Sequence, residues 1–205
     1  MELKKEFVLI IFLINLVGRI NATNNIQTRI ILDKTAACIG SKGGTSANFQ
    51  ILGGKIKTTS GSIAIKGNKF HARTPQAIIW YDGKTQWTYM KKTNEVNISS
   101  PTVAQQVSIN PYTFINIYRS GYNITMKVID KNYQIHLIST DNRKSIKEMY
   151  LLINKVSYHP IQIKMRPKDE WITVNITNFN KKNLPNSTFI FKAKDCPSAE
   201  IIDLR

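Results

Sequence analysis

The chain has few of the residues that build catalytic or metal centres. Its 205 residues include 13 Asp and Glu, 3 His and 2 Cys. His71, His136 and His159 lie far apart in the sequence, and neither a His-x-x-x-His nor a Cys-x-x-Cys spacing occurs. Because metal sites need clustered ligands, we expect none. The acidic residues form no obvious acid–base pair and no Gly-x-Ser-x-Gly elbow is present, so we expect neither an enzyme nor a bound cofactor.

Negative charge is scarce relative to positive charge. The chain has 29 Lys and Arg, and its formal net charge is +16. In an exported protein this charge favours anionic lipid headgroups or an acidic partner surface. The basic residues are spread through predicted strands and turns, with only pairs such as Lys91-Lys92 adjacent, so we expect no nucleic-acid partner. A solvated basic surface is the simpler interpretation.

No apolar run is long enough to span a membrane. The run over residues 7–17 falls short of the roughly 20 residues that a transmembrane helix needs. Lys4 and Lys5 precede it, and Ala22 offers a small residue for cleavage, which is typical of a secretory signal peptide. We therefore expect a signal peptide over residues 1–22 and a single domain over residues 23–205. An uncleaved anchor is the alternative.

Export bears on the two cysteines, because an oxidising compartment permits a disulfide bond. Cys38 and Cys196 lie near opposite ends of the mature chain. A bond between them would stabilise the fold by roughly 4–5 kcal/mol in the chain-entropy model. Two separate buried thiols fit the sequence equally well, so the pair is a candidate disulfide only.

Alternation of apolar and polar residues indicates a mainly β protein. A helix is expected first, over residues 25–40, with an apolar stripe of Ile26, Ile30, Ile31 and Ala37. A helical insert is expected over Pro101–Ser120, ended by Gly121. The expected strands span residues 46–52, 54–59, 61–66, 69–73, 76–81, 85–90, 95–99, 122–129, 132–139, 147–155, 160–166, 170–178 and 189–192.

The connections between these strands are local, which predicts an antiparallel sheet. Asp82-Gly83 between two of them predicts a two-residue type I′ turn. A sheet of this many strands curves, so we expect an α+β, mainly β fold: an incomplete barrel with helices on its concave face, around an apolar space. An ordinary packed core is the alternative. The candidate lining residues are Phe49, Ile63, Ile65, Phe70, Ile79, Trp87, Tyr89, Phe114, Ile117 and Tyr118.

The order of the motifs resembles that of a known family. Gly-x-Ile-x-Ile-x-Gly-x-x-Phe at Gly61–Phe70, then Pro75, then Asp-Gly-Lys-Thr-x-Trp-x-Tyr at Asp82–Tyr89, then the insert at Pro101–Ser120 resemble the LolA-like periplasmic carriers of outer-membrane lipoproteins. The ending Ala199–Arg205 is similar to endings in one branch of that family. The resemblance extends over essentially the whole mature chain.

This resemblance implies a monomeric periplasmic chaperone of a Gram-negative envelope, whose half β-barrel holds the acyl chains of lipoproteins. It also implies an inner-membrane ATP-driven lipoprotein-release transporter as donor and an outer-membrane acceptor. It places Phe70 near the mouth of the cavity. One departure is that Lys66, Gly67 and Asn68 stand where well-known members have an arginine that holds the lid shut. A sensing or scaffolding module of the same fold, binding a protein partner, is the alternative.

Overall fold

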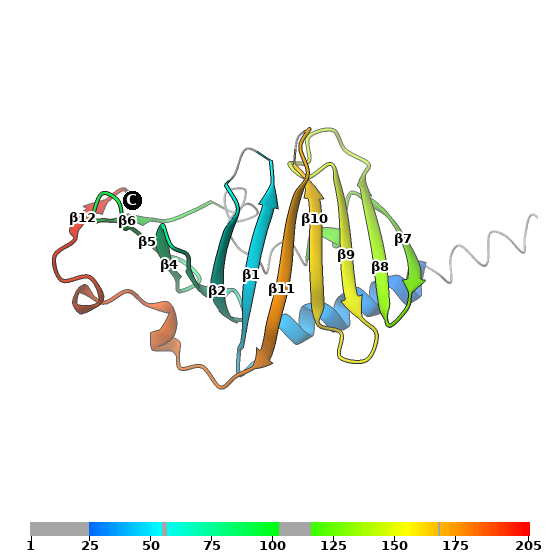
Figure 1. Ribbon diagram of the computed structural model, residues 1–205, viewed down its shortest axis with the longest axis horizontal. Helices are drawn as coiled ribbons and strands as arrows, with labels where there is room; N and C mark the ends of the chain where they lie inside the picture. The colour runs from blue at the N-terminus through cyan, green and yellow to red at the C-terminus, as the bar shows by residue number, and fades with distance from the viewer. Residues whose placement is uncertain (1–24, 55–56, 103–115, 168) are drawn as a thin grey trace, which may run out of the picture.

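The computed structural model describes residues 25–54, 57–102, 116–167 and 169–205, and in them a twelve-stranded sheet crossed by an N-terminal helix (Figure 1). The expected signal peptide and most of the expected helical insert, Phe114 included, lie outside these residues. The strands are β1 (Thr45–Gly53), β2 (Thr59–Lys66), β3 (Lys69–Arg73), β4 (Ala77–Tyr81), β5 (Gln86–Met90), β6 (Glu95–Ser99), β7 (Tyr122–Ile129), β8 (Asn132–Ser139), β9 (Glu148–Asn154), β10 (Pro160–Arg166), β11 (Ile172–Lys181) and β12 (Glu200–Asp203).

The sheet is open and joins two meanders through one long-range pairing. Its strand order is β12-β6-β5-β4-β3-β2-β1-β11-β10-β9-β8-β7. Antiparallel pairing of β1 with β11, with Phe49 opposite Ile176 and Ile51 opposite Val174, connects the two meanders. Among the described strands, the first and last of the order do not pair, so the sheet is an incomplete barrel, as expected from the sequence.

The helix spans residues 25–39, close to the expected bounds, and lies across one face of the sheet (Figure 1). We call this the inner face and the opposite one the outer face. The expected apolar stripe is wrong in part, because Ile26 and Ile30 are 63% and 49% exposed and Ala37 is also exposed. The buried stripe follows a spacing of three and four residues instead, and consists of Thr28, Ile31, Leu32, Thr35, Ala36 and Ile39.

The helix packs on two separate clusters of the inner face. Its first half, with Ile31 and Leu32, joins a larger cluster formed mainly by β7, β8, β9 and β10. Its second half, with Ala36 and Ile39, joins a smaller cluster with Ile65, Phe70 and Tyr81. The helix therefore connects the two meanders from the inside.

A β-bulge adjusts the strand pairing between the meanders. The register of β1 with β11 shifts between Ser46 and Asn48, and Asn178 opposite this shift has a φ of 51°. The inserted residue changes the alternation, so Phe179 follows Ile176 onto the inner face and packs against the smaller cluster.

The chain after β11 differs from the expected pattern. Residues 189–192 do not form the expected strand; η2 (Asn186–Phe189) and η3 (Ala193–Asp195) are short 3-10 helices, and β12 pairs in parallel with β6. We call residues 184–199 the C-terminal arm. Phe189 is fully buried, and Phe191 packs edge-on against Trp80 of β4 with ring centroids 5.3 Å apart.

Two local expectations at turns are also wrong. The described part of residues 54–59 forms no separate strand, since Gly54 is in a turn and Thr59 begins β2. The β4–β5 connection is longer than a two-residue type I′ turn, and of its two central residues only Gly83 has positive φ. The Asp82 carboxylate accepts hydrogen bonds from the backbone N–H groups of Lys84 and Thr85, both at 2.8 Å, and this side chain organises the turn instead.

Candidate functional site

An apolar strip lies on the inner face between the buried centres of the two clusters, across β11, β1, β2, β3 and β4. Its side chains are only half buried, although their hydrophobic neighbours under the helix are fully buried. Phe49 and Ile51 of β1 belong to neither cluster. We call this surface the inner strip; its residues are Phe49, Ile51, Ile63, Ile79, Val174 and Ile176.

The register places these side chains on one face. Ile51 pairs with Val174, and Phe49 pairs with Ile176 on one side and with Gly61 on the other. Since cross-strand partners share a face, the pairings Ala47 to Ile63, Ile63 to Ala72 and Ala72 to Ile79 carry the same face from β1 to β4. The strip thus extends across five adjacent strands.

Gly61 makes room for the aromatic ring of the strip. A Cβ atom at this position would lie 2.6 Å from Cζ of Phe49 and 2.2 Å from the backbone oxygen of Arg73. The absence of a side chain lets the Phe49 ring lie over β2 and lets β3 approach closely. The glycine therefore shapes the floor of the inner strip.

Five of the residues proposed from the sequence share this face in or next to the strip. Phe49, Ile63 and Ile79 are in the inner strip itself. Ile65 and Phe70 lie deeper, in the smaller cluster; Phe70 is 1% exposed and its ring centroid is 5.4 Å from that of Tyr81. These two residues are buried beside the strip and do not form its surface.

Ile117 and Tyr118 lie elsewhere, at the larger cluster. Both are in η1 (Ile117–Arg119), and Tyr118 is buried. The Tyr118 hydroxyl donates a hydrogen bond to Asp33 of the helix. Burial, and then the neighbouring Asp33 carboxylate, raise the pKa of Tyr118 to about 12. This residue ties the helix to the end of the insert.

Trp87 and Tyr89 lie on the outer face, away from the strip. Trp87 pairs with Trp80 and Tyr89 with Ile78, whereas Ile79 and Tyr81 face inward. The Tyr89 hydroxyl donates to Oδ1 of Asn94 at 3.0 Å. Strand β4 carries apolar residues on both faces, and β5 turns Gln86 and Thr88 inward and its aromatic residues outward, so alternation alone did not show which set faces inward.

Residues of β11 were missed by the sequence reasoning. Val174 and Ile176 alternate with polar residues, a pattern visible in the sequence, but only the pairing with β1 brings them beside Phe49. Ile51 was missed for the same reason. The alternation in β11 was therefore visible in the sequence, whereas its pairing with β1 was not.

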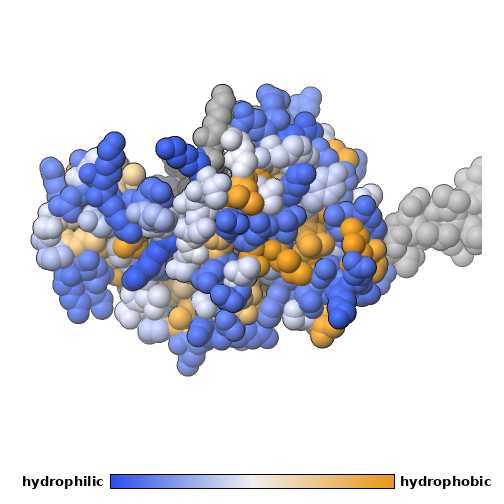
Figure 2. All heavy atoms as spheres, in the orientation of Figure 1, coloured by the Kyte–Doolittle hydropathy of each residue, from blue (hydrophilic) through white to orange (hydrophobic). Residues whose placement is uncertain are grey.

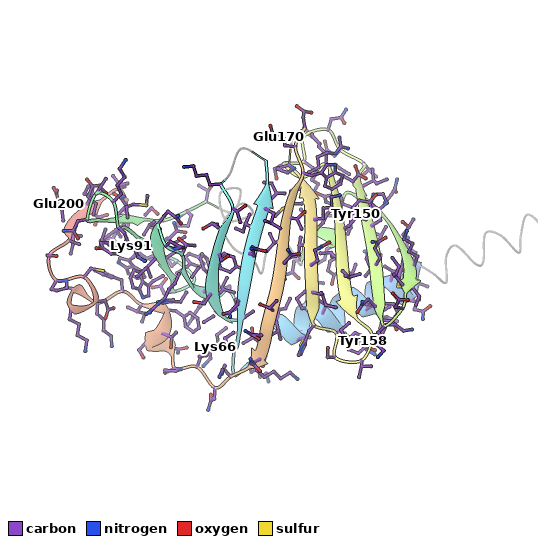
Figure 3. All side chains as sticks on the ribbon, viewed as in Figure 1. Lys66, Lys91, Tyr150, Tyr158, Glu170 and Glu200 are labelled. Carbon is purple, nitrogen blue, oxygen red and sulfur yellow. The ribbon has the colours of Figure 1, made fainter. Side chains whose placement is uncertain are left out.

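Lys66 holds the C-terminal arm. Its Nζ donates a hydrogen bond of 2.6 Å to the backbone oxygen of Leu184, where the arm begins (Figure 3). In the family resemblance this is one of the positions near the missing arginine. Here the cation fastens the arm to the end of β2.

The candidate disulfide is not formed, and both cysteines are free. Cys38 is on the helix, with Sγ 3.9 Å from the backbone oxygen of Ser157, whereas Cys196 follows η3 in the arm. The two residues thus lie over different halves of the sheet. Burial raises the pKa of both thiols, so both stay protonated at neutral pH.

The described ranges contain neither a metal cluster nor a membrane-spanning helix. No group of three or more His, Cys, Asp or Glu side chains is arranged there to hold a metal ion. No helix in that part of the chain has the length and hydrophobicity needed to cross a bilayer.

Comparisons with known proteins identify the family and the fold. The family model described as "Outer membrane lipoprotein carrier protein LolA" matches residues 20–169. An uncharacterized conserved protein from Thermus thermophilus has 13% identity and a TM-score of 0.60, with 86% of this chain and 99% of that chain covered. At this identity the likeness shows a shared fold.

Two further solved structures are less similar. A LolA superfamily protein from Nitrosomonas europaea has 12% identity and a TM-score of 0.45, over 80% of this chain and 97% of that chain. LprF from Mycobacterium bovis has 10% identity and a TM-score of 0.43, over 78% and 94%. Comparison with curated proteins finds no match. Because the family model covers well over half of the chain, this protein belongs to the LolA family of outer membrane lipoprotein carrier proteins.

Proposed function

We propose that the mature chain binds the acyl chains of lipoproteins on the inner strip and carries them across the periplasm. The observation that carries this proposal is the inner strip itself, a row of half-buried apolar side chains on the inner face of an open sheet. Phe49 and Ile51 belong to neither hydrophobic cluster, so a bound acyl chain would complete their burial. Membership of the lipoprotein carrier family supports the same role.

The energetics suit a reversible carrier. Burying methylene groups gains about 0.8 kcal/mol each, so acyl chains leave water readily for an apolar surface. A strip that stays partly open to solvent can release its cargo to a membrane that buries the chains more fully. Direction would come from a donor and an acceptor, for which the family resemblance implies an inner-membrane ATP-driven transporter and an outer-membrane receptor.

Export by a cleaved signal peptide over residues 1–22 is part of this proposal. The formal net charge is +16 for the whole chain, and such a surface is attracted to anionic membranes and acidic receptor faces. The same charge would assist docking at both ends of the transfer.

A lipopeptide-binding experiment tests the proposal. Residues 23–205 are mixed, without detergent, with a synthetic triacylated lipopeptide that carries an environment-sensitive dye, and complex formation is followed by fluorescence and size-exclusion chromatography. We expect a stable soluble complex, and transfer of the lipopeptide to outer-membrane vesicles. A protein that gives no such complex would not be a carrier of this kind.

A matched pair of variants locates the binding surface. Ile51→Glu puts a charge into the inner strip outside both clusters, and should reduce lipopeptide binding at least tenfold, since burying an unpaired carboxylate is costly. Ile138→Glu changes an apolar residue that is 47% exposed on β8, and should bind normally. Circular dichroism confirms that both variants are folded. Equal binding by the two variants would exclude the inner strip as the site.

Binding of a protein partner is the second candidate. It is favoured by the fully buried Leu32 and the buried Ile39, which show that helix side chains already fill the inner face over both clusters. Deletion in the native organism separates the two functions. Retention of lipoproteins in the inner membrane supports transport, whereas an altered envelope-stress response with normal lipoprotein location supports partner binding.

A further inference from the structure

A polar groove crosses the outer face of the sheet, opposite the inner strip. It consists of two adjoining hollows of about 430 Å³ and 650 Å³, and Asn48, Ser62 and Arg73 line both of them. The groove runs over β11, β1, β2 and β3. Figure 2 looks onto this face and shows mainly blue and white atoms over β1 and β2, with orange atoms over β8 to β10.

The strand register arranges the lining side chains in rows. One row is Thr177, Asn48, Ser62 and Arg73, on β11, β1, β2 and β3 in turn. A second row, two residues along, is Asn175, Gln50 and Ser60. Neighbouring strands are about 4.8 Å apart, so each row is a closely spaced ladder of hydroxyl and amide groups.

Much of this hydrogen-bonding capacity is unused. Within the described residues, the side chains of Ser46, Asn48 and Ser62 make no hydrogen bond to another protein group. Hydroxyl and amide groups each donate and accept, so they match a ligand with many hydroxyl groups.

Three cations border the groove, and hydrogen bonds hold two of them, Arg73 and Lys91, in place. Nε of Arg73 donates to Nε2 of His71 at 2.9 Å, and Nδ1 of His71 lies 3.0 Å from the backbone oxygen of Thr188 in the C-terminal arm. Burial, and then the charge of Arg73, lower the pKa of His71, so the ring is neutral at pH 7. Its Nε2 accepts the hydrogen bond from Arg73, and its proton is therefore on Nδ1, which donates to Thr188. Nζ of Lys91 donates to the backbone oxygen of Thr74 at 2.9 Å. Lys182 is the third cation, and none of the described lining residues is acidic.

An aromatic platform lies beside the groove, beyond β11. The rings of Tyr150 and Trp171 are 5.7 Å apart, and Nζ of Lys164 lies 4.8 Å from the Trp171 centroid. Tyr150 pairs with Lys164 in the neighbouring strand, on the outer face that Figure 3 shows. Glu148 of this region is paired with Arg166 at 2.8 Å, whereas the exposed Asp169 and Glu170 directly precede Trp171 and bound the platform at its far end.

We propose that the outer groove binds an acidic polysaccharide. The ladders match sugar hydroxyls, the cations match carboxylates, and the partly exposed aromatic platform, with His136 stacked on Tyr150 and Lys164 over Trp171, offers ring surface to sugars at one end. An acidic peptide would use the cations but would leave most of the hydroxyl and amide ladder without a matching pattern. Polyuronate chains have carboxylates, hydroxyl groups and sugar rings together. The groove lies on the opposite face of the sheet from the inner strip, and of the strip residues its hollows touch Phe49 and Ile63 but not Ile51.

Calorimetric titration with defined probes tests the proposal. Residues 23–205 are titrated with oligogalacturonate, with a neutral malto-oligosaccharide of equal length, and with polyglutamate of equal charge. We expect the oligogalacturonate to bind at least about tenfold more tightly than either of the others, as expected when charged and neutral hydrogen bonds act together. Equal binding of polyglutamate would mean that the groove takes an acidic peptide and not a saccharide. No binding of oligogalacturonate would also overturn the proposal.

Two charge-matched variants locate the site. Arg73→Gln should weaken oligogalacturonate binding about tenfold, because a charged hydrogen bond is lost. Lys131→Gln removes the same charge from an exposed turn between β7 and β8, and should leave binding within twofold. Equal effects of the two variants would mean attraction to net charge only, which contradicts a site.

Two further variants keep the result interpretable. Should Arg73→Gln fail to fold, the exposed Lys182→Gln replaces it, with the same expectation. The inner-strip variant Ile51→Glu should keep its affinity for oligogalacturonate. Failure of the carrier proposal and failure of this one are therefore distinguishable.

Discussion

The two halves of the sheet differ in how many of their faces are covered. The half from β7 to β11 is covered on its inner face by the first half of the helix, and its outer face carries polar groups such as His136, Glu148 and Lys164. The half from β3 to β6 meets only the end of the helix on its inner face, and the C-terminal arm covers its outer face. One meander is therefore a one-sided sheet, whereas the other is packed on both sides.

This difference determines which surfaces remain available. Where the arm covers the outer face, Trp80 becomes a core residue although it points away from the helix. Between the halves, the middle of β1 and β2 has half-buried side chains on its inner face and exposed ones on its outer face. The inner strip and the outer groove both lie in that central region.

The largest expected effect separates the two halves. Phe189→Ala removes a fully buried ring from the arm and should lower the free energy of unfolding by about 3–5 kcal/mol. Because the arm covers Trp80, the variant should also red-shift tryptophan emission under native conditions. Ile190→Ala, at a neighbouring residue that is 41% exposed, is the control and should change little.

The same measurement on the other half sharpens the comparison. Leu32→Ala removes a fully buried side chain of the helix and should cost about 2–5 kcal/mol without exposing Trp80. Both variants are measured by urea denaturation with tryptophan fluorescence. A native-state red shift in Leu32→Ala, or none in Phe189→Ala, would show that the two halves are not covered independently.

A medium effect is expected at the junction of the halves. Gly61→Ala places a Cβ against the Arg73 backbone oxygen and the Phe49 ring, and should cost about 1–3 kcal/mol, as overpacking does. Ser62→Ala, one residue along on the outer face, is the control. Thermal unfolding of both variants measures the difference. An unchanged Tm for Gly61→Ala would mean that β2 and β3 can move apart freely.

The smallest effect is a pH dependence of the β7–β11 half. Burial raises the pKa of Tyr122 from its usual 10 to about 12, and its hydroxyl donates to the Ile146 backbone oxygen at 2.8 Å. The unfolded chain loses this proton near pH 10 and the folded chain only near pH 12. The stabilisation is therefore complete below pH 10 and is lost as the pH rises from 10 to 12.

The variant Tyr122→Phe tests this dependence. It should lose about 1 kcal/mol at neutral pH with the hydrogen bond, and should lose stability less steeply than the parent protein above pH 10. Urea denaturation at several pH values between 8 and 11 measures both effects. Parallel pH profiles for the two proteins would contradict the assigned role.

Local features of the fold were predictable from the sequence. The helix bounds and most strands follow from apolar periodicity and from turn residues such as Gly121, which lies between η1 and β7 with a φ of 76°. The incomplete barrel followed from the number of strands and their local connections. Phe49, Ile63 and Ile79 of the inner strip were identified because their alternation is clear.

The remaining features depend on residues far apart in the sequence. The face of Trp87 and Tyr89 depends on where the C-terminal arm packs, a contact between segments about a hundred residues apart. Val174 and Ile176 enter the strip only through the pairing of β1 with β11. The type I′ turn failed because the Asp82 side chain satisfies the backbone of a longer turn.

The sequence by itself determined the periodicity of each element, the sign of the charge and the family of the protein, because these depend on neighbouring residues or on composition. Only the tertiary structure decided which face of each strand is inner, how the two meanders join, and that the two thiols stay apart. The reason is physical: strands with apolar residues on both faces are equally compatible with either orientation until another segment covers one of them.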